Sequence, residues 1–190
     1  MSNRYWDLND FLAEDEYVNA VANQTYYNLA ILDNSVKKDT RDLEEGKKFD
    51  IPLWLAIRLG TEYLTIEVPS TYREKFKKVL IADPTVVNLR DKSFYYYEVG
   101  YKLCKYIDDK DLIPLLARVF LKRMQVIQRK SFCLGNEDVM GFVKKLTQVE
   151  REIFEGGRYS VTTYKIWKDA VTSASIHSTT SRLRKKVKKT

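Results

Sequence analysis

The chain has 190 residues and a formal net charge of +7, with 44% hydrophobic and 31% charged residues. This composition is typical of a globular protein with an apolar core, and no apolar run approaches the ~20 residues of a membrane-spanning helix. The polar N-terminus does not resemble a secretory signal, so we expect a soluble intracellular protein without membrane contact. We expect the two cysteines to be buried thiols.

The positive charge is concentrated at the C-terminus. No acidic residue follows Asp169, and residues 171–190 predict a basic, disordered tail. Three roles stay open for this tail: a nuclear import signal, which we favour, a weak nucleic-acid contact, or a solvated terminus. Because the charge lies in a tail, it gives no basic face on a folded body. The basic residues concerned are Arg182, Arg184, Lys185, Lys186, Lys188 and Lys189.

The first 84 residues predict a small domain of mixed α/β structure. Runs of β-branched and aromatic residues indicate strands near residues 17–21 and 26–32, and alternation indicates a third at 63–68. The polar residues 36–47 predict a mobile loop between these elements.

Three helices are expected in the same segment. Asp7 can cap a short helical turn, and Pro52 can stand in the first turn of a helix that ends at Gly60. Ser70 can cap a third helix, which continues to about Ala82 and is stopped by the Asp-Pro step that follows.

Residues 85–170 predict a helical domain. The first helix of this segment, near residues 94–107, is apolar on two sides, because large side chains recur at steps of three and four on both. A second helix covers residues 112–127, and a third covers residues 139–153 and ends at the glycine pair 156–157. A short final helix contains Trp167.

The residue types required for catalysis are scarce. The single histidine, His177, lies in the approach to the tail without a fixed partner, and two cysteines with one remote histidine cannot form a four-ligand zinc site. No glycine-rich phosphate loop is present, and we interpret the carboxylate clusters as solvated or capping groups. We therefore expect no enzymatic activity, no metal and no cofactor.

The aromatic run from Phe94 to Tyr97 has two interpretations. In the first, the rings stack on the bases of a single-stranded nucleic acid and neighbouring lysines neutralise its phosphates. This alternative function would also use the basic tail. The other interpretation is packing, either within the chain or against another subunit. A helix apolar on two sides must be covered on two sides, and a segment of this length has few helices to do so.

Several ordered motifs resemble the Psf three family of the GINS complex. They include the opening segment YWDLNDFLA at residues 5–13, IPLWLA at 51–56 and ADPTVVNL at 82–89, with later matches at 150–154 and Trp167. Within these motifs we assign a structural role to Trp6, Leu8, Asp10, Pro52, Leu53, Trp54, Asp83 and Pro84. We expect the residues at 52–54 to stabilise the first domain, so that Trp54→Ala costs ~3–5 kcal/mol.

The resemblance implies an α+β fold that is predominantly helical, with a β-containing B domain over residues 1–84 and a helical A domain over 85–170. It implies a non-catalytic subunit of a nuclear heterotetramer with two other Psf subunits and one Sld subunit. This complex joins the Mcm hexamer and the Cdc partner as the replicative helicase, and contact of the chain with DNA is indirect or weak. Our candidates for the subunit interface are Phe94, Tyr96, Tyr97, Tyr101, Phe120, Met124, Ile127, Ile153, Phe154 and Trp167.

Overall fold

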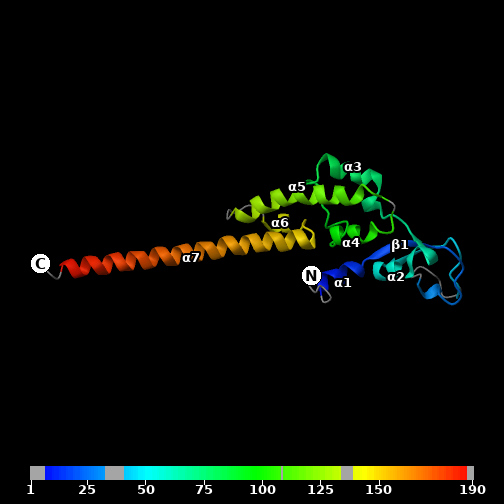
Figure 1. Cartoon of the computed structure of the whole chain (residues 1–190), viewed down its shortest axis with the longest axis horizontal. Coiled ribbons are helices and arrows are strands. Elements are labelled where there is room, and N and C mark those ends of the chain that lie inside the picture. The colour runs from blue at the N-terminus through cyan, green and yellow to red at the C-terminus, as the bar shows by residue number, and fades with distance from the viewer. Residues whose placement is uncertain (1–6, 33–40, 108, 134–138, 188–190) are drawn as a thin grey trace.

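The computed structural model describes residues 7–32, 41–107, 109–133 and 139–187, with side chains up to residue 172. A small sheet and its helices form one end of the molecule, the other helices pack beside them, and one long helix projects away (Figure 1). The predicted α+β, predominantly helical fold is confirmed. The sheet contains β1 (Tyr17–Ala22), β2 (Lys48–Pro52) and β3 (Leu64–Ile66), and the helices are α1 (Leu8–Glu14), α2 (Leu53–Tyr63), α3 (Glu74–Ala82), α4 (Tyr96–Leu103), α5 (Leu112–Phe132), α6 (Val139–Val143) and α7 (Gln148–Val187).

The sheet is antiparallel, with the strand order β2-β1-β3. Every second residue of β1 from Val18 is buried, and Ala20 pairs with Phe49 on one side and Ile66 on the other. The strands predicted near residues 17–21 and, from alternation, at 63–68 are therefore confirmed as β1 and the shorter β3. One face of the sheet packs on the core.

The strand predicted at residues 26–32 is wrong. Tyr26 forms only an isolated bridge with Leu43, and residues 30–32 form a 3-10 turn. Asn28 adopts a φ of 60°, which an extended strand cannot accommodate. The strand β2 comes instead from residues 48–52. In the described part of the predicted loop, Leu43 is fully buried, so this part is anchored to the core.

The helix starts follow the predicted capping in part. The Asp7 carboxylate accepts a hydrogen bond from the Asn9 N–H at 3.1 Å, as expected for the cap of α1. Pro52 precedes α2 instead of lying in its first turn, and α2 continues past a kink at Gly60, whose φ is 69°. Ser70 begins a separate 3-10 turn, so α3 starts only at Glu74.

The predicted helix over residues 139–153 is divided into α6 and α7. Helix α7 then passes through Gly156 and Gly157, so the predicted end at the glycine pair is wrong. A Cβ atom on Gly157 would lie 2.3 Å from the Ser131 Oγ of α5, which shows that this glycine allows close helix packing. The same helix includes Trp167 and continues to Val187, where the sequence predicts a disordered tail from residue 171.

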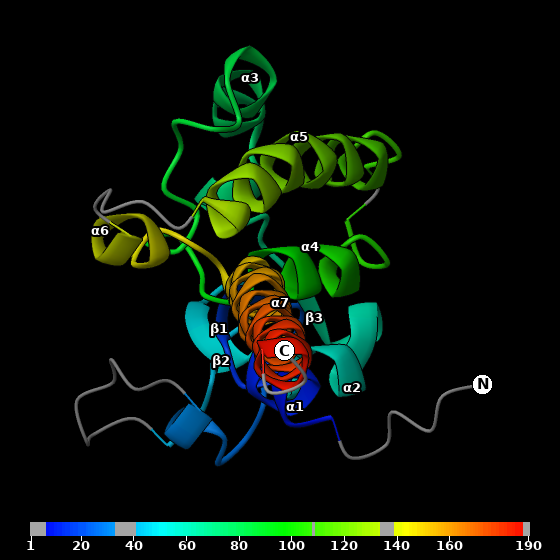
Figure 2. The same cartoon turned by 90° about the vertical axis from the view of Figure 1, so that its left-hand side faces the viewer.

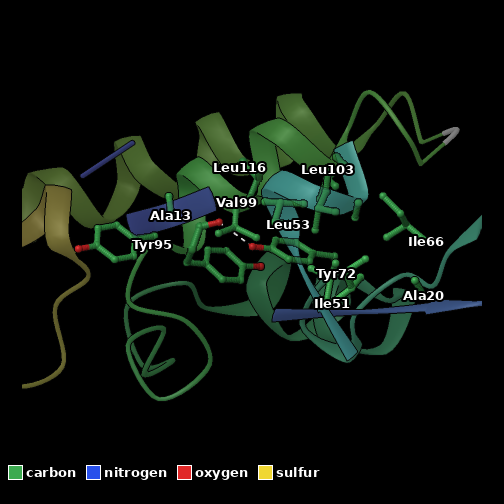
Figure 3. Packing of buried hydrophobic residues seen from close by; sticks show 14 of the residues in the cluster. Ala13, Ala20, Ile51, Leu53, Ile66, Tyr72, Tyr95, Val99, Leu103 and Leu116 are labelled. Atoms are coloured by element: carbon green, nitrogen blue, oxygen red, sulfur yellow. Dashed lines mark hydrogen bonds between the residues drawn. The ribbon is translucent and has the colours of Figure 1, made fainter. Parts of the chain in front are cut away.

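One apolar core joins the predicted first domain to the helical segment (Figure 3). The rings of Tyr72 and Tyr96 stack with centroids 4.9 Å apart, and the Tyr72 hydroxyl donates a hydrogen bond to the Tyr96 carbonyl at 2.7 Å. A second, smaller cluster contains Ile127 of α5, Leu146 of the segment after α6 and Phe154 of α7, and side chains of α6 pack against it. Figure 2 shows the backbone of α6 beside α5. The domain boundary after residue 84 stays a prediction.

The motif residues have different environments. Leu53 and Pro84 are buried, and Asp83 accepts a hydrogen bond from the Thr85 N–H at 2.8 Å directly after α3. Trp54 is 45% exposed, so Trp54→Ala should cost less stability than the ~3–5 kcal/mol expected for a core residue. Leu8 is 68% exposed. Trp6 lies outside the described residues.

Candidate subunit interface

A buried ion pair fixes α7 against α5. The Arg123 Nε donates to Glu150 Oε1 at 2.6 Å and its second terminal nitrogen donates to Glu150 Oε2 at 2.9 Å. The other terminal nitrogen donates to the carbonyls of Pro84 and Val87, both at 2.8 Å. The Tyr97 hydroxyl donates to Glu150 Oε1 at 2.8 Å. Four segments therefore meet at one buried charge pair.

The surroundings of Arg123 favour its charged form. Burial alone would lower the pKa of Arg123, but the hydrogen bonds and charge of Glu150 raise it. Burial, followed by the charge of Glu150, raises the pKa of the Tyr97 hydroxyl well above its usual range. We missed this pair in the sequence, although a signal exists. Arg123 interrupts the apolar stripe of α5, and Glu150 interrupts that of α7, with opposite charge.

An open groove of about 650 Å³ lies between α1, α4 and α5. Tyr97 and Phe120 contribute to its wall and pack edge to face, with ring centroids 5.2 Å apart. Tyr101 and Ile113 also line it and are 59% and 48% exposed. The groove therefore presents aromatic and aliphatic surface that the described residues leave uncovered.

Helix α7 projects beyond the other helices (Figure 1). At 100° per residue, Tyr164, Trp167 and Val171 lie along one stripe, and Tyr159 and Ile166 lie along a neighbouring stripe. All five are roughly half exposed or more, from 49% at Val171 to 73% at Tyr159. The remaining side of α7 is polar. Such a wide apolar surface on a projecting helix indicates contact with another chain.

The structure separates the ten interface candidates into three groups. Tyr96, Ile127 and Phe154 are buried inside the chain, so these three are core residues and their assignment to an interface is corrected. Tyr101 and Trp167 are exposed. The five partly buried candidates are Phe94, Tyr97, Phe120, Met124 and Ile153. The exposed Tyr159 and Ile113 were missed, because their significance depends on which helix faces are already covered.

The aromatic run offers little surface to a nucleobase. Tyr95 and Tyr96 are buried, and the Tyr96 ring packs against Tyr72, Phe76 and Tyr97. Stacking by the run is therefore prevented at two of its rings. The side chains of the six basic tail residues lie outside the described residues.

Two members of the acidic clusters, Glu16 and Asp109, have structural partners in the part of the chain that the structure describes. Ser93 donates to Glu16 at 2.8 Å, and Lys77 forms an ion pair with Asp109. Cys104 is partly buried but Cys133 is exposed, which corrects the expectation of two buried thiols. Within the described ranges, no group of three or more acidic, histidine or cysteine residues could hold a metal ion. Nor does any described helix combine the length and apolarity needed to cross a bilayer.

Comparison with known proteins agrees with the two parts of this architecture. Residues 71–168, more than half of the chain, match the GINS complex protein helical bundle domain, and residues 6–61 match the PSF3 N-terminal domain. The chain is 34% identical over 165 residues to the probable DNA replication complex GINS protein PSF3 of Dictyostelium discoideum, a match covering 86% of this chain and 61% of that relative. It is 29% identical over 168 residues to the DNA replication complex GINS protein PSF3 of Xenopus laevis, covering 86% and 79%.

The human protein of the same name is 30% identical over 128 residues, covering 65% of this chain and 59% of the relative. The chain thus spans less than two thirds of the length of two of these relatives. The two matched domains account for residues 6–61 and 71–168, and they occur in the order expected from the motifs. The chain therefore belongs to the PSF3 family of GINS complex proteins.

Proposed function

We propose that the chain is a non-catalytic scaffold subunit of a heterotetrameric GINS complex, in which it binds two other Psf subunits and one Sld subunit. The complex joins the Mcm hexamer and the Cdc partner to form the active replicative helicase in the nucleus. The observation that supports this proposal is the projecting part of α7, with its two stripes of exposed aromatic and aliphatic side chains.

The groove and α7 provide two apolar surfaces for the sister subunits. Apolar patches of this kind are rarely left uncovered, because each exposed large side chain loses the free energy of burial. Obligate interfaces often exceed ~2,000 Å² and resemble a protein core cut in two. The exposed Tyr101, Tyr164 and Trp167 would then become core residues of the complex.

A scaffold can raise the activity of its neighbours without catalytic residues. A protein that binds one conformation of the helicase more tightly shifts the population toward that conformation by its difference in affinity. Omission of this subunit from an otherwise complete assembly should therefore reduce DNA unwinding, and unchanged unwinding would contradict the mechanism.

Chromatography with multi-angle light scattering tests the assembly directly. We expect the chain to elute with its sister subunits as a stoichiometric complex, and Trp167→Asp to disrupt this complex because it places a charge in an apolar interface. Lys165→Asp is the matched control, since Lys165 is exposed on the polar side of the same helix, away from both stripes. A wild-type chain that stays monomeric beside its sister subunits would refute the proposal.

A further inference from the structure

The groove contains an acidic residue whose charge lacks a partner. Glu98 lies in the first turn of α4 and lines the groove, while its Oε2 atom is buried without a hydrogen-bond partner among the described residues. Buried carboxylate oxygens in folded proteins are normally paired, because the loss of hydration must be compensated. The position of Glu98 therefore requires an explanation.

Two lysines, Lys102 and Lys105, line the groove together with Glu98, and neither forms an ion pair with Glu98 in the described part of the chain. Lys105 is exposed. Lys102 lies one helical turn after Glu98, but its ammonium group forms ion pairs with Asp10 and Glu14, both at 2.7 Å. Two buried cations near α4 are also paired, Arg123 with Glu150 and Lys77 with Asp109. A contact of Lys102, Arg123 or Lys77 with Glu98 would therefore require the loss of an existing ion pair.

The local field also favours an additional positive charge. Burial raises the pKa of Glu98, and repulsion by Glu152, Glu16 and Asp10 raises it further, against a partial lowering by its own backbone N–H. A cation placed in the groove would reduce both effects, since it replaces lost hydration and offsets the surrounding acids.

The walls of the groove favour arginine as the source of this cation. Tyr97, Tyr101 and Phe120 provide aromatic surface beside Glu98, together with the aliphatic side chains of Ile113 and Leu116. A guanidinium group stacks on aromatic rings and pairs with a carboxylate through two N–H groups, whereas an ammonium group is more strongly hydrated. The volume of about 650 Å³ can hold several side chains.

We propose that Glu98 binds an arginine of a sister subunit, carried on a segment whose apolar side chains fill the groove between α1, α4 and α5. This inference rests on the proposed assembly with sister subunits. The additional contact is an ion pair between Glu98 and an arginine, and it lies in the groove between α1, α4 and α5.

The test measures the affinity of the full chain for the assembled sister subunits. Glu98→Gln keeps the size of the side chain and removes its charge, and we expect the dissociation constant to rise about 10- to 100-fold. Glu45→Gln, at an exposed position in the turn before β2, is the matched control and should leave affinity unchanged. Equal binding by wild type and Glu98→Gln would overturn this inference alone, whereas absence of wild-type binding would overturn the proposed function with it.

Charge reversal identifies the partner residue. Glu98→Arg should abolish binding, and one Arg→Glu change among the sister subunits should restore it. If no such change restores binding, the proposal is overturned. A background lacking residues 2–6 tests whether the N-terminus of the chain itself fills the groove. We expect the Glu98→Gln effect to persist there, and its disappearance would also overturn the proposal.

Discussion

At the scale of single residues, two buried charges have opposite consequences for the isolated chain. Glu150 is paired with Arg123, whereas the partly buried Glu98 has no ion pair within the described ranges and its Oε2 atom lacks a hydrogen-bond partner there. The Arg123–Glu150 pair connects segments that are distant in the sequence. Removal of either charge would leave the other one buried without its partner. The charge of Glu98 destabilises the isolated chain, so it is better explained by contact with another molecule than by folding.

Glu98→Gln should stabilise the isolated chain at neutral pH. Because the folded state raises the pKa of Glu98 above its ordinary value of 4.5, stability is lost as the pH rises from that value through the folded pKa. We expect the variant to raise the melting temperature by about 1–3 °C at pH 7 and by almost nothing near pH 4. Thermal unfolding at both pH values checks this, and an equal shift at the two would exclude the titration of Glu98 as its cause.

Arg123→Met should destabilise the chain by about 3–5 kcal/mol, because it leaves the Glu150 carboxylate buried without its cation. The double variant with Glu150→Leu should recover much of this loss, since no buried charge remains. Arg151→Met is the control, because Arg151 pairs with Glu155 on the surface and should cost less than about 1 kcal/mol. Urea unfolding of the wild type, Arg123→Met, Glu150→Leu and the double variant gives the coupling energy. Additive losses would show that the two side chains act independently.

At the scale of elements, local patterns predicted those helices and strands whose ends are set by nearby residues. The Asp7 cap, the β-branched and aromatic residues of β1 and the apolar stripe of α5 depend on neighbours within a few positions. The failures depend on distant contacts. Residues 26–32 have strand-forming side chains, but the edge of β1 pairs with residues 48–52, whose Phe49 and Ile51 are buried.

The candidate site was predictable only in part, for the same reason. Two-sided apolar character near residues 94–107 indicated an interface, yet the sequence could not show that the chain itself buries Tyr96 and leaves Tyr101 exposed. The coverage of each face depends on how α3, α4 and α5 pack. The glycine pair shows the same limit, because a C-terminal cap and a close helix contact both favour glycine.

The two adjacent glycines of α7 should respond differently to alanine. A Cβ atom on Gly156 meets nothing within 4 Å, so Gly156→Ala should stabilise the chain by about 0.5–1 kcal/mol through helix propensity. Gly157→Ala should destabilise it, because the new methyl group would overlap the Ser131 side chain. Chemical unfolding of the two variants measures the difference, and each variant is a control for the other because both add one methyl group. Stabilisation by both would contradict the close packing of α7 on α5.

At the scale of the whole molecule, α7 divides into a packed part and a projecting part. Its beginning is fixed by Glu150 and Phe154, and the Arg158 side chain still donates to the Cys133 carbonyl at 3.1 Å. The large apolar side chains that follow are exposed. Folding of the isolated chain and assembly with other subunits should therefore depend on different parts of one helix.

Truncation of α7 separates these two contributions. A chain that ends at Val161 keeps the contacts of Arg158 and Glu150, so we expect its melting temperature to stay within about 3 °C of the wild-type value. The same truncation removes Tyr164, Trp167 and Val171, so it should abolish co-elution with the sister subunits. A chain that ends at Thr172 retains both stripes and should still assemble. Assembly of the shorter chain at wild-type affinity would show that the projecting helix is not the interface, and the groove would then have to supply the contact alone.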